Sequence, residues 1–187
     1  MNFRSVFWIK ARKIAMFAMA GGFAVIWLMK SFGGPPSDRL PQGVPVPAAK
    51  LVWLSGGEGI LNPAELKGKA VLINFWATWC GACREEIGVL KKLHERYGGD
   101  DFMVVGITEE PPARVRAFVD QHDVTYPIVR DPGGRFSNRF NVRSIPFFIF
   151  VDANGKVVGD VTGPMGADYA SERIEAILPS KDGAKGG

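Results

Sequence analysis

The sequence of 187 residues contains two cysteines and two histidines, and this shortage excludes several classes of protein. A disulfide-stabilised secreted scaffold needs more cysteines, and a chain of this length can bury a core without them. A structural zinc site needs four ligands, but His94 and His122 belong to no paired ligand motif. A phosphate-binding glycine loop is also missing, because Gly133-Gly134 follows Asp131-Pro132 in a pattern typical of a turn.

The formal net charge of +4 does not indicate nucleic-acid binding. Four of the basic residues (Arg4, Lys10, Arg12 and Lys13) precede the one long apolar run of the chain. No basic run interleaved with aromatic residues follows it, so the sequence lacks the usual footprint of a nucleic-acid interface.

Residues Ile14–Met29 form an uncharged run directly after Arg12-Lys13. A helix of this length spans about 24 Å, and the span reaches the full bilayer core of about 30 Å if Lys30 extends to the headgroups and the span continues toward Gly34. We expect an uncleaved transmembrane signal anchor over residues 14–30. A cleaved signal peptide is the alternative, although no small-residue cleavage site follows the run. Basic residues before the run predict a cytoplasmic segment over residues 1–13. The remainder is then expected on the periplasmic or extracytoplasmic side of the inner membrane.

Residues 31–49 contain five prolines and three glycines without periodicity. This composition predicts a semi-extended linker that holds a folded domain away from the membrane. A structured N-terminal extension is the alternative. The folded domain is expected over residues 50–179, and the polar residues 180–187 are expected to form a disordered tail.

Short apolar runs alternate with helical patterns along this domain. Strands are expected at Leu51–Leu54, Ile60–Leu61, Ala70–Phe75, Phe102–Ile107, Phe147–Val151 and Lys156–Val161, the last two joined through an Asn-Gly turn. Helices are expected at 82–97, 112–122 and 167–178, with a short helix from Asn62-Pro63 to Leu66. The order predicts an α/β domain with a mixed central sheet flanked by helices, which is the order of a thioredoxin-like fold.

Both cysteines lie between a buried strand and the helix that follows it. Cys80 and Cys83 are separated by Gly81-Ala82, so Cys80 is expected at the N-terminus of that helix. Unpaired N–H groups and the helix dipole stabilise a thiolate there, which makes Cys80 the expected nucleophile. Cys83, one turn inside the helix, is expected to resolve the mixed disulfide. The pair predicts a redox-active disulfide with no other cofactor.

A glutamate shares the apolar face of this helix. On a helical wheel Glu86 falls within a sector of about 120°. That sector also contains Cys83, Ile87, Leu90, Leu93 and Tyr97. A carboxylate on this face should have a raised pKa and could exchange a proton with the buried thiol. The alternative is that Glu86 tilts outward and complements the helix dipole.

The predicted site includes three more residues outside the cysteine motif. Trp79 precedes Cys80 and is a candidate contact for partner proteins, whereas Trp76 is expected in the core. Ile145-Pro146 precedes a strand, a position that proline tolerates. A cis bond there would bring backbone close to the disulfide, where it could hold an extended substrate.

The segment from Asn74 to Glu86, NFWATWCGACREE, resembles the motif of the TlpA/ResA-like membrane-anchored thioredoxins. The resemblance extends over residues 51–178 and includes Leu66-Lys67-Gly68-Lys69, Ser144-Ile145-Pro146 and the turn at 152–156. It implies that Cys80 attacks the client disulfide and that Cys83 resolves the mixed disulfide. It also implies that Pro146 is the family's cis-proline and that Glu86 is the family's acidic residue three positions after the second cysteine. Client contacts are then expected at Trp79, Gly81, Ala82 and Ile145. A second acid of this family matches either Glu109 or Glu110. Gly81-Ala82 departs from the family's usual proline-containing dipeptide, so the redox potential cannot be transferred.

The sequence therefore predicts an exported thiol–disulfide oxidoreductase that reduces disulfides of client proteins. The resemblance implies apocytochrome c or copper-delivery proteins as clients, and a membrane thiol-electron donor as the second partner. A disulfide-forming oxidant on the same fold is the nearest alternative. A non-catalytic module that binds copper or a partner protein is the alternative of another class, since two thiolates can bind copper(I).

Overall fold

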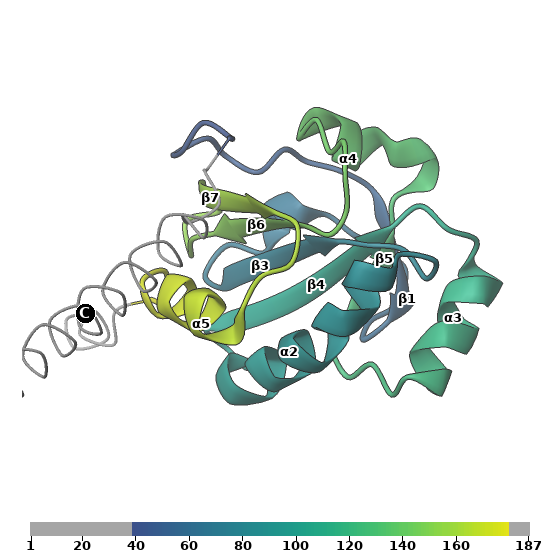
Figure 1. Ribbon diagram of the computed structural model, residues 1–187. Coiled ribbons are helices and arrows are strands. Elements are labelled where there is room, and N and C mark those ends of the chain that lie inside the picture. The colour runs from purple at the N-terminus through teal and green to yellow at the C-terminus, as the bar shows by residue number, and fades with distance from the viewer. Residues whose placement is uncertain (1–38, 180–187) are drawn as a thin grey trace, which may run out of the picture. The chain divides into compact units, whose positions relative to one another are not determined.

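The computed structural model describes residues 39–179, in which seven strands form one sheet in the order β2-β1-β5-β4-β3-β6-β7 (Figure 1). The strands are β1 (Leu51–Ser55), β2 (Ile60–Leu61), β3 (Ala70–Phe75), β4 (Phe102–Thr108), β5 (Ile128–Arg130), β6 (Phe147–Val151) and β7 (Val157–Thr162). The α-helices are α2 (Gly81–Tyr97), α3 (Pro112–Gln121), α4 (Arg135–Arg139) and α5 (Ala167–Glu175), and the 3-10 helices are η1 (Pro63–Glu65) and η2 (Pro132–Gly134).

Strand β3 lies at the centre of the sheet, and all six of its residues are buried. It pairs in parallel with β4, from Ala70 opposite Phe102 to Phe75 opposite Ile107. On its other side it pairs antiparallel with β6. A strand that is buried on both faces needs a continuous apolar run, which is what the sequence AVLINF provides. The predicted mixed sheet is confirmed.

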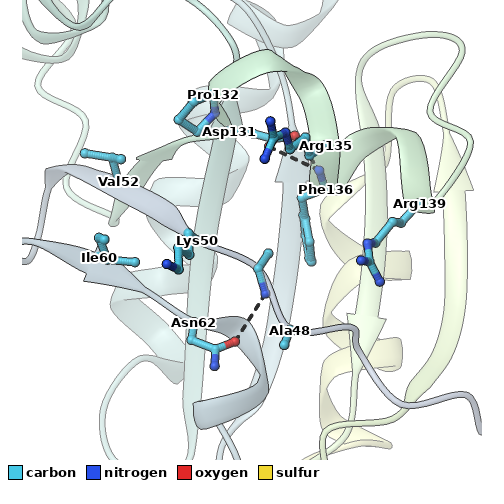
Figure 2. Close-up of a pocket in the computed structure, with 11 residues that line it drawn as sticks. Ala48, Lys50, Val52, Ile60, Asn62, Asp131, Pro132, Arg135, Phe136 and Arg139 are labelled. Carbon is cyan, nitrogen blue, oxygen red and sulfur yellow. Dashed lines mark hydrogen bonds between the residues drawn. The ribbon is translucent and has the colours of Figure 1, made fainter.

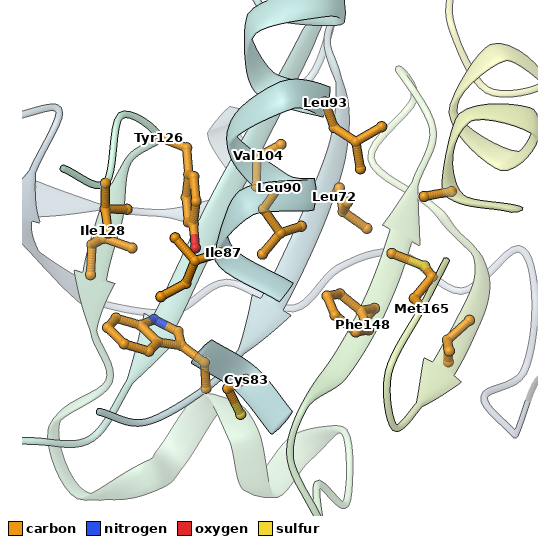
Figure 3. Packing of buried hydrophobic residues seen from close by; sticks show 14 of the residues in the cluster. Leu72, Cys83, Ile87, Leu90, Leu93, Val104, Tyr126, Ile128, Phe148 and Met165 are labelled. Carbon is orange, nitrogen blue, oxygen red and sulfur yellow. The ribbon is translucent and has the colours of Figure 1, made fainter. Parts of the chain in front are cut away.

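Alternating side chains of the sheet feed two hydrophobic clusters, one on each face. The first cluster includes Leu72, Val104 and Phe148 and packs under α2, α3 and α5 (Figure 3). The second includes Ile73, Val105 and Ile149. It is covered by Phe136, which lies in α4, and by Phe140, which directly follows α4. Figure 1 shows α2 and α5 on one side of the sheet and α4 on the other.

The predicted elements are present with small shifts at their ends. Helix α2 begins one residue earlier than expected, α3 ends at Gln121, and α5 ends at Glu175. The short helix after Asn62 is η1, whose first turn is capped because the Asn62 side chain accepts from the Ala64 amide at 3.2 Å.

Strand β5, η2 and α4 were not predicted. They are three, three and five residues long, too short to show a clear hydrophobic period. Tertiary contacts stabilise them instead. The buried carboxylate of Asp131 accepts from the amides of Phe136 and Ser137 at 2.9 to 3.1 Å and fixes the start of α4.

The described part of the predicted linker, residues 39–49, pairs with the edge strand β7. The amide of Gly43 donates to the Val157 carbonyl at 2.7 Å, and the Val157 amide donates to the Val44 carbonyl at 2.9 Å. The carboxylate of Asp160 accepts from the amides of Arg39 and Leu40 at 2.6 Å. These contacts cover an otherwise open sheet edge. The folded domain therefore begins before residue 50, and this part of the linker corresponds to the alternative of a structured extension.

The predicted cytoplasmic segment 1–13, the anchor 14–30, the first linker residues 31–38 and the tail 180–187 lie outside the described residues. Between residues 39 and 179, no helix is long and apolar enough to cross a bilayer.

Gly106, in the middle of β4, faces crowded surroundings that a larger side chain would disturb. A Cβ atom there would lie 2.5 Å from Ile128 Cδ1 and 2.9 Å from Trp76 Nε1. Gly106→Ala is expected to lower the free energy of unfolding by about 1–3 kcal/mol through overpacking, measured by urea denaturation. Gly88→Ala, on the exposed face of α2 with nothing within 4 Å, should instead raise it by about 0.5–1 kcal/mol. Equal effects of the two variants would contradict this packing.

Candidate active site

The loop between β3 and α2 carries the cysteines and is fixed at both ends. The amide of Trp76 donates to the Ile107 carbonyl at 3.0 Å and so continues the pairing of β3 with β4 by one residue. The amide of Cys80 donates to the Ala77 carbonyl at 3.1 Å and closes a tight turn. Trp76 is buried in the core, as predicted.

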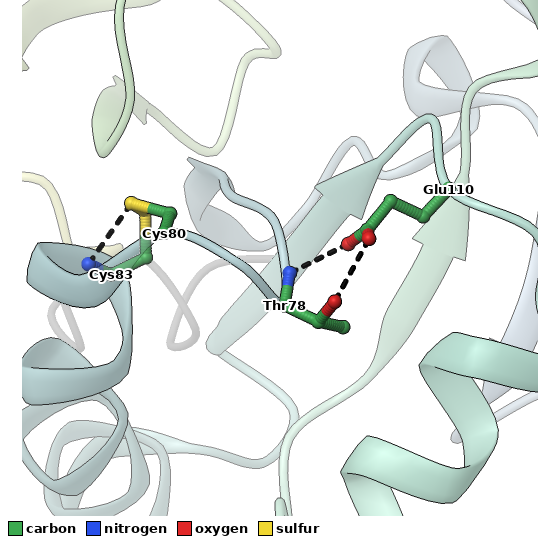
Figure 4. Close-up of a disulfide and its surroundings, with 4 residues drawn as sticks. All are labelled: Thr78, Cys80, Cys83 and Glu110. Atoms are coloured by element: carbon green, nitrogen blue, oxygen red, sulfur yellow. Dashed lines mark hydrogen bonds between the residues drawn. A yellow bond between two sulfur atoms is a disulfide. The ribbon is translucent and has the colours of Figure 1, made fainter.

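Cys80 and Cys83 form a disulfide at the start of α2, with their Cα atoms 5.2 Å apart (Figure 4). Cys80 is the N-cap residue, and its sulfur accepts from the Cys83 amide at 3.2 Å. This is the position where helix N–H groups and the dipole stabilise a thiolate. Cys80 retains 6% exposure and Cys83 only 1%, so the first cysteine is the more accessible to an incoming sulfur.

Ile145 and Pro146 are joined by a cis peptide bond directly before β6. The bond has the conformation that the sequence resemblance implied. The carbonyl of Pro146 accepts from the Gly163 amide at 2.8 Å, which ties this loop to the end of β7. Pro146 is buried and Ile145 is half-buried.

Trp79 and Ile145 line a common cavity of about 310 Å³ at the carboxyl ends of β3 and β4. Trp79 is 71% exposed, the largest exposure of any large hydrophobic residue that the structure describes. Gly81 is exposed in the first turn of α2, whereas Ala82 packs partly against the first cluster. The structure thus brings Trp79 and Ile145 together and places Gly81 and Ala82 between the cysteines.

Glu86 is buried at 6% exposure and does not tilt outward. One carboxylate oxygen accepts from the Met165 amide at 3.2 Å, while the other has no hydrogen-bond partner among the described residues. Burial raises the pKa of the Glu86 carboxyl above its ordinary value of 4.5, the Met165 amide lowers it, and the negative charge of Glu85 raises it. The carboxyl therefore holds a proton to a higher pH than an exposed glutamate does.

Tyr126 and Asn74 are two further buried residues with polar side-chain groups. Burial and the charge of Glu86 raise the pKa of the Tyr126 hydroxyl, so it remains protonated. Asn74 is 1% exposed on β3, and its side-chain oxygen has no hydrogen-bond partner among the described residues. An amide cannot exchange a proton as a carboxyl can, which leaves Glu86 as the buried carboxyl on this side of the site.

Glu110 holds the loop that precedes the disulfide. Its carboxylate accepts from the Thr78 amide at 2.6 Å and from the Thr78 hydroxyl at 2.8 Å (Figure 4). It also forms an ion pair with Arg114 at 3.5 Å. Glu109, its neighbour, instead accepts from the Ser137 hydroxyl at 3.1 Å. The sequence could not separate these adjacent acids, because their roles depend on which side of the turn after β4 each one faces.

A family model described as Redoxin matches residues 41–178 of the chain. The chain belongs to the redoxin family. It is 35% identical over 140 residues to the thioredoxin-like protein YneN of Bacillus subtilis, a match that covers 73% of this chain and 80% of that protein. It is 29% identical over 181 residues to the thiol-disulfide oxidoreductase ResA of Halalkalibacterium halodurans, a match that covers 96% of this chain and 99% of that protein.

Solved structures of related proteins confirm the thioredoxin-like fold. A thiol:disulfide interchange protein of the thioredoxin family from Chlorobium tepidum superimposes with a TM-score of 0.65 at 28% identity, over 76% of this chain and 100% of that one. The exposed lipoprotein thioredoxin Etrx1 of Streptococcus pneumoniae superimposes with a TM-score of 0.62 at 25% identity. The match covers 70% of this chain and 99% of that one. With a cysteine pair of matching spacing, the chain is a thiol–disulfide oxidoreductase of the ResA type.

The raised pKa of Glu86 has a consequence for stability. Because the folded chain holds this proton more tightly than the unfolded chain, the stability contributed by the protonated form is present below pH 4.5 and is lost as pH rises through the raised pKa. The free energy of unfolding of Glu86→Gln minus that of the native protein should therefore be larger at pH 7 than at pH 4. Urea denaturation of both oxidised proteins at the two pH values measures this difference. Glu95→Gln, at an exposed position of the same helix, is the matched control. A parallel pH profile for native protein and Glu86→Gln would contradict the assignment.

Proposed function

We propose that the chain reduces disulfides of client proteins outside the cytoplasm. The Cys80 thiolate attacks one sulfur of the client disulfide, and the second client sulfur leaves as a thiolate. The Cys83 thiolate then attacks the Cys80 sulfur, which releases the client as a dithiol and leaves Cys80 and Cys83 oxidised. Two electrons pass to the client, and a membrane thiol-electron donor returns two electrons to the pair. The observation that carries this proposal is the N-cap position of Cys80, whose sulfur already accepts from the Cys83 amide.

Glu86 is proposed as the proton acceptor for Cys83. The two residues are three positions apart on α2 and both are buried, so they share one face of the helix. The carboxylate oxygen that lacks a hydrogen-bond partner supports this role. A buried thiol must lose its proton before it can attack, and the carboxylate form of Glu86, whose pKa is raised, is a stronger proton acceptor than an exposed glutamate.

Client contacts are proposed at the residues around the disulfide. An extended client segment could pair with the backbone of Ile145, as strands pair at a sheet edge, because the neighbouring Pro146 has no N–H and its carbonyl already accepts from the Gly163 amide. Trp79, exposed beside the cavity that Ile145 also lines, could pack against client side chains. Gly81 and Ala82 add little bulk between the cysteines, which leaves Cys80 open to a client. Apocytochrome c and copper-delivery proteins are the clients that the family resemblance suggests.

The direction of the reaction is tested by the reduction potential of the pair, measured by equilibration with glutathione or dithiothreitol. We expect a value near that of thioredoxin, about −270 mV, whereas a value near −120 mV would make the chain an oxidant. Cys83→Ser should abolish the two-electron transition and accumulate mixed disulfide at Cys80. Absence of any two-electron transition in the native protein would favour a non-catalytic binding module instead.

We further propose that residues 14–30 anchor the chain in the inner membrane, with the folded domain on the periplasmic or extracytoplasmic side. The support is the uncharged run after Arg12-Lys13. The full chain should stay in the membrane fraction after extraction with alkaline carbonate. A chain that begins at Asp38, which keeps the segment paired with β7, should be released. Extraction of both forms would contradict the anchor.

A further inference from the structure

A second and larger cavity, of about 820 Å³, is lined by neither Cys80 nor Cys83 (Figure 2). Residues 48–50, the strands β1 and β2, and the segment from η2 to α4 form its walls. None of its lining residues lines the cavity beside Trp79. The thiol–disulfide reaction described above makes no use of it.

Three basic residues surround this cavity: Lys50, Arg135 and Arg139. All three are exposed, and none forms an ion pair with an acidic side chain in the part of the chain that the structure describes. Asp131 is the single acid among the lining residues, and its buried carboxylate is occupied by backbone amides of α4 and the Ser137 hydroxyl. The three cations around the cavity therefore have no ion-pair partner among the described residues.

This local positive charge contrasts with the charge of the domain as a whole. Residues 39–179 contain 16 lysines and arginines against 17 aspartates and glutamates, a formal charge of −1. A concentration of three unopposed cations on a nearly neutral domain creates a local positive potential, which attracts and orients acidic partners.

The cavity also presents apolar side chains to solvent. Ile60 is 59% exposed and Val52 is 36% exposed. They are two of the four large hydrophobic residues that are exposed within residues 39–179, and both line this cavity. Exposed apolar residues within a charged rim are the arrangement of a protein–protein interface. Small-molecule sites instead place a few polar groups deep inside an enclosed pocket, which the exposed cations here do not do.

We propose that this cavity is a docking site for an acidic segment of a partner protein. Carboxylates of the segment would pair with Lys50, Arg135 and Arg139, and its aliphatic side chains would cover Val52 and Ile60. The occupant is another protein, because the parts of this chain outside residues 39–179 are themselves basic. Residues 1–38 carry five lysines and arginines against one acid, and residues 180–187 carry two lysines against one.

The test uses a fluorescein-labelled twelve-residue peptide of glutamate, leucine and serine and the full chain in a nonionic detergent. Fluorescence anisotropy gives the Kd. The double variant Arg135→Gln/Arg139→Gln should weaken binding by about tenfold or more. The matched double variant Lys92→Gln/Arg116→Gln removes two exposed cations from α2 and α3 and should change the Kd less than twofold. Binding to the native chain should also weaken as NaCl is raised.

Two further variants separate charge from apolar contact. Lys50→Gln alone should weaken binding in the same direction, which keeps the test valid if the arginine double variant unfolds. Ile60→Ser should weaken binding of the leucine-containing peptide. It should leave unchanged the Kd of a peptide in which serine replaces every leucine. Reduction of the Cys80–Cys83 disulfide by dithiothreitol should proceed at the native rate in all of these variants, because the cavity is separate from the disulfide.

Three outcomes would overturn the proposal. An equal loss of affinity in both double variants would show that binding follows net charge and not this cavity. If the native chain bound the peptide without leucine as tightly as the leucine-containing peptide, the cavity would be a simple anion site. Self-association of the native chain in sedimentation, lost in Arg135→Gln/Arg139→Gln, would assign the cavity to a second copy of the chain.

Discussion

The parallel pairing of β3 with β4 is the constraint on which the active site depends. It fixes the point where β3 stops and, through the bond from the Trp76 amide to the Ile107 carbonyl, continues one residue into the loop. Strand β4 then ends beside this loop, so that Glu110 reaches the amide and hydroxyl of Thr78. Cys80 is thereby placed at the N-terminus of α2 by a sheet that is buried on both faces. Rigid elements position a reactive group more accurately than a loop alone could.

Burial of Glu86 illustrates a conflict between stability and chemistry. A carboxylate at 6% exposure with one amide donor is poorly solvated, and the fold stabilises its protonated form. The same environment raises the pKa of this carboxyl, so that it keeps its proton to a higher pH than an exposed glutamate does. Replacing Glu86 by an apolar residue would stabilise the core and remove that group. This cost to stability supports the proposed role of Glu86 in proton exchange.

Sequence patterns predicted the parts of this fold in which one local signal decides the outcome. The continuous apolar run of β3, the helical period of α2 and the cysteine spacing each specify their structure within one segment, and the wheel placed Glu86 on the buried face. The missed parts depend on distant contacts. Strand β5 forms because β1 and β4 offer edges on both sides, and residues 39–49 are ordered by β7 and Asp160. Likewise, only the turn after β4 decides that Glu110 and not Glu109 holds Thr78.

Helix α4, which no sequence pattern announced, joins the two surfaces of the molecule. The Ser137 hydroxyl is within 3.1 Å of Glu109 in the cavity beside Trp79 and within 2.9 Å of Asp131 in the wall of the basic cavity. The exposed residues Arg135 and Arg139 of the same helix face that second cavity (Figure 2). A partner held at the basic cavity would therefore contact the same short helix whose Ser137 lines the cavity beside Trp79. If one client chain occupied both cavities, its cysteines would meet Cys80 at a raised effective concentration, without any change in the chemistry of the disulfide.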